Sequence, residues 1–323
     1  MSTKIIMKQI TPLLPPIIKK IITRCSPLLL DKVQEIRLRE ERPLMLVWSQ
    51  GDVMLNIRGE AVKRKEDAYR LKKEELQQLL QTISNHSLYA FEEELRNGYL
   101  TVPGGHRIGL VGKAVMVDGR IKLQKYISGV NIRISREVIG AGEKVVHYLL
   151  GKNSYVYSTL IVSPPQCGKT TLLRDLVRLL SGGVDSYGFS GVKVGLVDER
   201  SEIAACYEGV PQNDIGIRTD VIDGCPKVQG MMILIRSMSP QVLVTDEIGK
   251  IEDAAAVEEA LNAGVSVITT AHGSSMKDYR ERPGLKRLFE SKVFQRVIIL
   301  GMSKGVGTVE RIWDEEKSRN LLL

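Results

Sequence analysis

Aromatic side chains, paired cysteines and long apolar runs are all scarce in this sequence of 323 residues. Phe, Trp and Tyr make up 5% of it, which leaves little material for a surface that stacks on nucleic-acid bases. The four cysteines show no CxxC spacing, so we expect reduced thiols in a cytoplasm and neither a disulfide framework nor a zinc site. Lysines and prolines interrupt the apolar residues of the N-terminus well before the roughly 18–20 residues that span a bilayer. We therefore expect a cytoplasmic protein without its own transmembrane segment, peripheral to a membrane only through partners or surface charge.

Charge is distributed unevenly between the two halves of the chain, whose formal net charge is +8. Residues 1–150 hold 25 Lys and Arg against 16 Asp and Glu, whereas residues 151–323 hold 21 against 22. The basic excess therefore belongs to the N-terminal half. Such an excess suits nucleic acid, an anionic membrane surface or an acidic protein partner, and charge alone does not choose among them.

The hydrophobic pattern predicts two domains. In the N-terminal part, β-favouring runs at Glu35–Leu38, Pro43–Trp48 and Val53–Leu55 precede a segment with helical spacing at Lys72–Ile83. Turn signals with glycine follow, as expected for antiparallel hairpins. We interpret residues 1–145 as a basic α+β N-terminal domain.

Residues 146–323 show a different pattern, in which short, nearly unbroken apolar runs alternate with helical segments. Runs of this kind are typical of strands that are buried on both faces of a parallel sheet. The runs are Thr159–Val162, Val194–Val197, Val242–Thr245, Val265–Thr270 and Val297–Leu300. The pattern predicts an α/β domain with a parallel sheet.

The first of these runs leads into a candidate phosphate-binding loop and then a helix at Thr170–Leu180. The loop matches the P-loop pattern GxxxxGK[ST] except that Ser163 replaces the first Gly. Because proline has no N–H, the backbone donors for phosphate are expected from the residues next to the helix N-terminus, Cys167 to Thr170. Lys169 is expected to reach the β- and γ-phosphates and the Thr170 hydroxyl to ligate Mg²⁺. The predicted ATP-binding residues are Ser163, Pro164, Pro165, Gln166, Cys167, Gly168, Lys169, Thr170 and Thr171.

A second apolar run ends in two acids, Asp246 and Glu247. A carboxylate at that point can hold Mg²⁺ through water, and its neighbour can orient or deprotonate the attacking water. We assign Asp246 to the metal and Glu247 to the water.

Two further strand ends supply weaker candidates. Glu199 belongs to a run of three acids, Asp198, Glu199 and Glu202, which could assist the metal and the water or form a solvated loop. His272 ends another run and could bond the γ-phosphate or serve a structural purpose.

Several arginines are candidates to act between subunits or to sense phosphate, and the sequence does not rank them. They are Arg133, Arg136, Arg200, Arg218 and Arg236.

With these residues in place, the chain resembles the secretion ATPases of type II secretion and type IV pilus machines, and among them the branch that serves a sporulation channel. The resemblance covers most of the chain. Its motifs are PPQCGKTTLLRDL (164–176), VDERSEIAA (197–205), IRTDVIDGCPK (217–227), IRSMSPQVLVTDEIG (235–249) and TTAHG (269–273). EIRLREERP (35–43) and GYLTVPGGHRIGLVG (98–112) resemble the N-terminal domain of such ATPases.

The resemblance implies a RecA-like core of the P-loop (AAA+-related) type, preceded by a smaller α+β domain. It implies ATP hydrolysis between the subunits of a homo-oligomeric ring, a hexamer, with His272 in the position of the histidine box. It also implies docking on membrane proteins of a sporulation channel, at the cytoplasmic face in the mother cell of a spore former, at the engulfment stage. What such a channel transports, and which membrane protein the ring docks on, are not given by the resemblance.

Three functions compete on this basis. The first is an ATP-hydrolysing motor subunit of a secretion or feeding channel. The second is a nucleic-acid-dependent RecA-like ATPase, which the basic half favours and the few aromatics disfavour. The third is a nucleotide-gated scaffold that hardly hydrolyses ATP, for which Ser163 is the only support.

Overall fold

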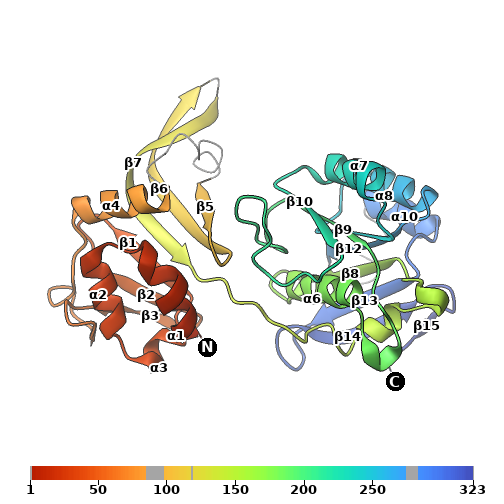
Figure 1. The fold of residues 1–323 in the computed structure, drawn as a ribbon, viewed down its shortest axis with the longest axis horizontal. Helices are drawn as coiled ribbons and strands as arrows, with labels where there is room; N and C mark the ends of the chain where they lie inside the picture. The colour runs from red at the N-terminus through yellow and green to blue at the C-terminus, as the bar shows by residue number, and fades with distance from the viewer. Residues whose placement is uncertain (1, 85–97, 118, 274–282, 323) are drawn as a thin grey trace. The chain divides into compact units, whose positions relative to one another are not determined.

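The computed structural model describes residues 2–84, 98–117, 119–273 and 283–322 (Figure 1). The chain divides into two compact units, Met1–Arg136 and Glu137–Leu323. This division falls nine residues before the boundary expected after residue 145. The intervening segment packs with the second unit, because the Gly142 N–H donates to Asp175 Oδ2 over 2.6 Å and Val145 lies in the second unit's core.

The first unit is built on one seven-stranded antiparallel sheet with the strand order β4-β3-β2-β1-β7-β6-β5. Its strands are β1 (Glu35–Arg39), β2 (Met45–Trp48), β3 (Gly51–Leu55), β4 (Ala61–Val62), β5 (Tyr99–Val102), β6 (His106–Val117) and β7 (Arg120–Arg133). Its helices are α1 (Ser2–Ile5), α2 (Pro16–Arg24), α3 (Pro27–Leu30) and α4 (Lys73–Ile83), with a π-helical segment at Ile6–Ile10 and a 3-10 turn at Thr11–Leu13. The three strands and the helix predicted from periodicity are therefore present within one or two residues.

One apolar core holds the first unit together. Leu76, Leu79 and Ile83 of α4 are buried at helical spacing, as their sequence positions predict. They share a cluster with α2 and with alternate residues of β1, Ile36 and Leu38.

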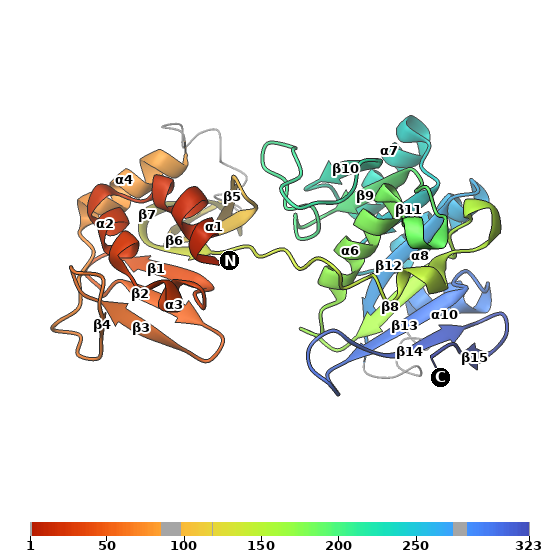
Figure 2. The same cartoon turned by 60° about the horizontal axis from the view of Figure 1, so that its bottom comes forward.

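The second unit contains an eight-stranded sheet with the order β10-β9-β11-β12-β8-β13-β14-β15 (Figure 2). Its strands are β8 (Thr159–Ser163), β9 (Val194–Asp198), β10 (Thr219–Asp223), β11 (Val242–Thr245), β12 (Ser266–His272), β13 (Arg296–Gly301), β14 (Thr308–Asp314) and β15 (Arg319–Asn320). Its helices are α6 (Lys169–Gly182), α7 (Lys227–Met238), α8 (Ile251–Asn262) and α10 (Pro283–Glu290), with 3-10 turns at Val146–Leu149, Lys152–Ser154 and Asp185–Tyr187. The first six strands in that order pair in parallel, and β14 and β15 add antiparallel.

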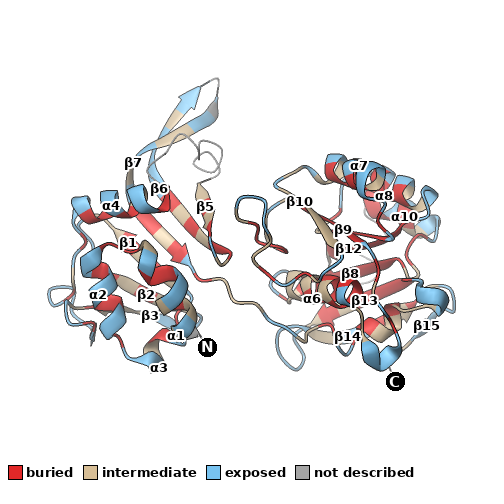
Figure 3. Cartoon of the chain, in the orientation of Figure 1, coloured by how far each residue is buried: buried red, intermediate tan, exposed pale blue. Residues whose placement is uncertain are grey.

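Alternate residues of the central strands face two different apolar clusters. Every residue of β8, β9 and β11 is buried, as the unbroken apolar runs predict (Figure 3). Ile161 of β8 lies in the cluster with α6, whereas its neighbours Leu160 and Val162 lie in the cluster with α7, α8 and α10. Helices therefore cover both faces of the sheet.

The parallel strands position the site. Because they run in the same direction, the carboxyl ends of β8, β9, β11 and β12 lie at one edge of the sheet, where α/β proteins bind ligands. The residues at these ends include Ser163, Asp198, Asp246 and His272.

In the part of the chain that the structure describes, no helix is both long and apolar enough to cross a membrane.

Candidate active site

The loop between β8 and α6 has the backbone of a phosphate-binding loop. Gly168 has a φ of +83° directly before the first residue of α6, and Gln166 has a φ of +61°. A Cβ added at Gly168 would lie 3.3 Å from the Cα of Gly307, so both the conformation and the close approach favour glycine. The N-terminus of α6 thereby faces the loop with its free N–H groups, which is a favourable place for an anion.

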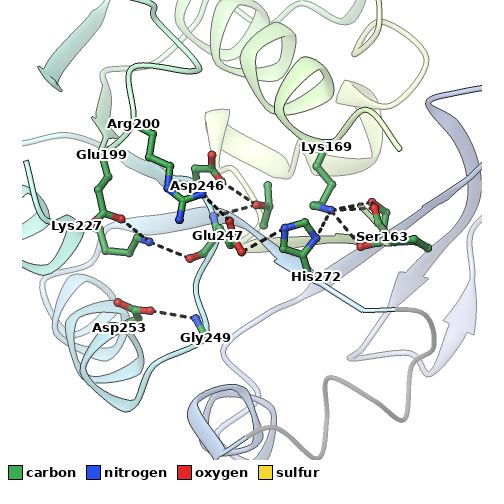
Figure 4. Close-up of polar contacts among 12 residues, drawn as sticks. Ser163, Lys169, Glu199, Arg200, Lys227, Asp246, Glu247, Gly249, Asp253 and His272 are labelled. Carbon is green, nitrogen blue, oxygen red and sulfur yellow. Dashed lines mark hydrogen bonds and ion pairs between the residues drawn. The ribbon is translucent and has the colours of Figure 1, made fainter. Parts of the chain in front are cut away.

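Lys169 is turned onto the loop in this form of the protein. Its Nζ donates to Ser163 O (3.1 Å), Ser163 Oγ (3.0 Å) and Pro164 O (3.1 Å), and lies 2.9 Å from His272 Nδ1 (Figure 4). Burial lowers the pKa of Lys169, and the charges of Cys167, Glu247 and Asp246 oppose that shift. The Ser163 hydroxyl, standing where the P-loop pattern has glycine, thus gives the ammonium an additional acceptor.

His272 connects Lys169 with Glu247. Because a Lys ammonium can only donate, the His272 Nδ1 beside it must accept, which leaves the ring hydrogen on Nε2. That nitrogen lies 3.2 Å from Glu247 Oε1. The imidazole therefore joins Lys169 to the residue assigned to the water.

Thr270 of β12 holds the acidic end of β11. Its Oγ1 accepts the Glu247 backbone N–H (2.9 Å) and donates to Asp246 Oδ1 (3.2 Å). Burial raises the pKa of Asp246, with the charge of Glu202 adding to the effect. Sequence reasoning named Thr270 only as part of the run before His272. Its position would have indicated Thr270, because residues two apart on a strand lie on the same face of the sheet and Thr270 stands two residues before His272.

Glu199 is paired with a lysine that sequence reasoning missed. Its Oε2 lies 2.8 Å from Lys227 Nζ, which also donates to the Glu247 carbonyl over 2.9 Å. Arg200 Nη1 lies 3.6 Å from Glu247 Oε2. Glu199, Arg200 and Lys227 belong to the lining of a cavity of about 430 Å³ next to the P-loop, together with Asp246 and Glu247.

The P-loop and the acidic strand end share a second cavity of about 410 Å³. It is lined by Gln166, Gly168, Lys169, Thr170, Thr171, Arg200, Glu202, Asp246, Glu247, Thr270, His272 and Val306. From the run of three acids, Glu202 lines this cavity, while Glu199 lines only the neighbouring one. Ser163, Pro164, Pro165 and Cys167 do not line this cavity. Ser163 and Cys167 are buried, with Cys167 Sγ 3.5 Å from Pro165 O, whereas Pro165 is exposed.

The residues in this cavity fit a magnesium-bound nucleotide. Lys169 and the N-terminus of α6 supply positive charge and N–H donors for phosphate oxygens. The Thr170 hydroxyl and the Asp246 carboxylate are oxygen ligands of the kind that Mg²⁺ prefers.

The five candidate arginines separate by location. Arg136 donates to Asp31 O and Val33 O, Arg218 donates to Ser181 O, and Arg133 lies beside Glu35, so each has a contact within its own unit. Arg200 lines the cavity shared by the P-loop and the acidic strand end, and Arg236 lies exposed near the end of α7. That one of these arginines acts between subunits stays a prediction.

Asp198 organises the acidic loop and does not line the cavity. Its buried carboxylate accepts the backbone N–H groups of Glu202 (2.8 Å), Ile203 (2.9 Å) and Ala204 (2.8 Å). Burial raises the pKa of Asp198 to about 6, although these three donors favour the ionised form. The loop that carries Glu199 and Arg200 is therefore folded around this carboxyl group.

Asp198→Asn is expected to lower the free energy of unfolding of the second unit by about 1–3 kcal/mol, because the amide nitrogen would face a backbone N–H without accepting it. The pKa of Asp198 is about 6 in the folded protein and near 3.9 in the unfolded chain. The contribution of this group to the stability of the fold is therefore complete below about pH 4 and is lost as the pH rises through 6. The deficit of the variant should therefore be larger at pH 5 than at pH 7. Urea denaturation in a Trp48→Phe background, where Trp313 of β14 reports on the second unit alone, measures it. An equal deficit at both pH values would contradict the raised pKa.

Fold and site together define a P-loop protein with a RecA-like core and an N-terminal α+β unit. Two solved proteins share this fold. The ATPase DotB of Legionella pneumophila aligns with a TM-score of 0.52 at 17% identity, over 86% of this chain and 77% of its own. The pilus retraction motor PilT, solved with bound ADP, aligns with a TM-score of 0.50 at 16% identity, over 83% and 74%. The fold class predicted from the sequence is confirmed.

The chain belongs to the family Sporulation stage III, protein AA, whose model matches residues 5–320. The Stage III sporulation protein AA of Bacillus subtilis (strain 168) is 45% identical to it over 310 residues, which is 96% of either chain. The resemblance inferred from the motifs is thereby confirmed.

Proposed function

We propose that this protein is an ATP-hydrolysing motor subunit that energises a membrane-embedded secretion or feeding channel during sporulation. The observation that carries the proposal is the cavity in which Lys169, Thr170, Asp246, Glu247 and His272 meet. Membership of a sporulation family and the shared fold with secretion-machine ATPases support the setting.

In the proposed reaction, Lys169 leaves the oxygens of Ser163 and Pro164 and donates to the β- and γ-phosphates of ATP. The Thr170 hydroxyl and the Asp246 carboxylate would hold Mg²⁺, which would supply positive charge to the phosphate oxygens. Glu247 orients the attacking water and accepts its proton. When Lys169 turns to the phosphates, His272 loses its Nδ1 donor, so nucleotide binding changes the contact between His272 and Glu247.

We further propose that the subunits form a homo-oligomeric ring, a hexamer, on the cytoplasmic face of the membrane. There it would dock through membrane proteins of the channel, and an arginine of a neighbouring subunit would stabilise the transferring phosphoryl group. Net charge in the first unit suits an acidic docking partner, whereas the small number of aromatic residues argues against nucleic acid.

Steady-state ATP hydrolysis by the purified wild-type chain tests the proposal, measured against protein concentration with light scattering and with or without DNA. Turnover that rises as the protein assembles and that DNA leaves unchanged is the expected result. DNA-stimulated hydrolysis with a steep salt dependence would instead favour the nucleic-acid-dependent ATPase. Assembly and ATP binding without hydrolysis, even with membrane proteins of the channel added, would favour the scaffold.

A further inference from the structure

Lys227 lies where a lysine is unfavourable for its own helix. It is the first residue of α7, and a positive charge at a helix N-terminus opposes the helix dipole. Its side chain is only 14% exposed. The position therefore needs another explanation, and its two partners provide one: the Glu199 carboxylate at 2.8 Å and the Glu247 carbonyl at 2.9 Å.

The Glu247 backbone needs to be held. Its φ of +36° lies in the left-handed region, which a residue with a Cβ adopts only when its surroundings enforce it. Thr270 accepts the Glu247 N–H through Oγ1 and the N–H of Ile248 through its carbonyl, both over 2.9 Å. Lys227 binds the Glu247 carbonyl on the other side (Figure 4). The strained residue is thus fixed at both of its backbone groups.

We infer that Lys227 is a positioning residue for hydrolysis, which acts through the Glu247 backbone and is itself kept in place by Glu199. This inference rests on the proposed function and adds to it a residue outside the nucleotide cavity. Without the Lys227 ammonium, the Glu247 carbonyl is free and the peptide can relax out of the left-handed conformation. The carboxylate then turns away from its present place, 3.2 Å from His272 Nε2 and 3.6 Å from Arg200 Nη1. The ion pair joins the loop after β9 to the N-terminus of α7, and the hydrogen bond from Lys227 to the Glu247 carbonyl extends this link to the loop after β11. Glu199 thereby has a role without contact to the nucleotide.

The test compares the wild type with Lys227→Met, which keeps an unbranched side chain one atom shorter and removes the charge. We expect kcat for ATP to fall by about 10²-fold, as for other small misplacements of a reacting group. KM and the Kd for the fluorescent nucleotide mant-ATP should stay within about twofold, since ground-state binding does not use Lys227. Lys227→Arg, which can still donate to both oxygens, should recover part of the loss.

Glu199 supplies the second arm of the test. Glu199→Gln should lower kcat less than Lys227→Met does. The double variant should have the same kcat as Lys227→Met alone, because both changes act through one contact. Lys193→Met removes an exposed lysine before β9, at the opposite edge of the sheet, and should match the wild type. Additive losses in the double variant would contradict the coupling.

Hydrogen–deuterium exchange of the backbone amides from Thr245 to Lys250 decides the inference independently of turnover. Exchange there should be faster in Lys227→Met than in the wild type, while the melting temperature is unchanged. Unchanged exchange together with unchanged kcat would overturn the inference. Loss of mant-ATP binding and of thermal stability along with kcat would also overturn it, because Lys227 would then be a structural residue. A wild type that does not hydrolyse ATP even with membrane proteins of the channel added would refute the proposed function, and the exchange comparison would still decide the role of Lys227.

Discussion

Glu247→Gln is expected to lower the turnover of ATP by about 10²–10⁴-fold, the range that a general base contributes. The amide keeps the shape of the side chain, and its single oxygen can still accept from His272 or from Arg200, but it cannot take a proton from water. Nucleotide binding should be retained, because Lys169, Thr170 and Asp246 remain in the cavity. Steady-state phosphate release, together with mant-ATP titration of the same preparation, measures both quantities.

Glu258→Gln is the matched control for this change. Glu258 lies on α8 and pairs with Arg287 on the surface, away from the cavity, so its variant should hydrolyse ATP like the wild type. Full turnover by Glu247→Gln would contradict the assignment of the base to Glu247. A wild type that is already as slow as Glu247→Gln, with sporulation unaffected by the change, would favour the nucleotide-gated scaffold over the motor.

The sheet and the main participants of the site could be predicted because they depend on local signals. Unbroken apolar runs identified five of the six described parallel strands, all except β10, whose residues are only half-buried. Parallel strands bring their carboxyl ends to one edge. Asp246, Glu247 and His272 could therefore be placed near Lys169 without knowledge of any side-chain contact. The antiparallel strands β14 and β15 carry fewer buried residues, and their hydrophobic period gave no comparable signal.

The contacts that hold the site could not be predicted, since they depend on side chains from distant segments. Lys227 stands 20 residues before Glu247 and binds its carbonyl, which no sequence pattern encodes. The positive φ of Glu247 is likewise imposed by its surroundings and not by its residue type. Asp198 shows the reverse case: its acidic motif suggested chemistry, whereas its carboxyl group is buried under three backbone N–H groups.

Lys169→Ala should affect binding as well as turnover, in contrast to Glu247→Gln. Hydrogen bonds to a charged group contribute about 1.5–3 kcal/mol, so the Kd for mant-ATP should rise by about 10–100-fold. Loss of a charged donor from the transferring phosphoryl group should lower kcat by about a further 10²-fold. Titration with mant-ATP and steady-state hydrolysis separate the two effects. Lys193→Ala, at the opposite edge of the sheet, serves as the control and should change neither.

Lys169→Arg should not restore the activity. The lysine Nζ is held among two carbonyl oxygens and a hydroxyl of Ser163 and Pro164, and a planar guanidinium on a longer side chain does not fit a site built for a compact ammonium. Unchanged mant-ATP affinity in both Lys169 variants would show that phosphate is bound elsewhere. Weakened binding with normal kcat at saturating ATP would restrict Lys169 to ground-state binding, and would show that turnover does not depend on the contact between Lys169 and His272.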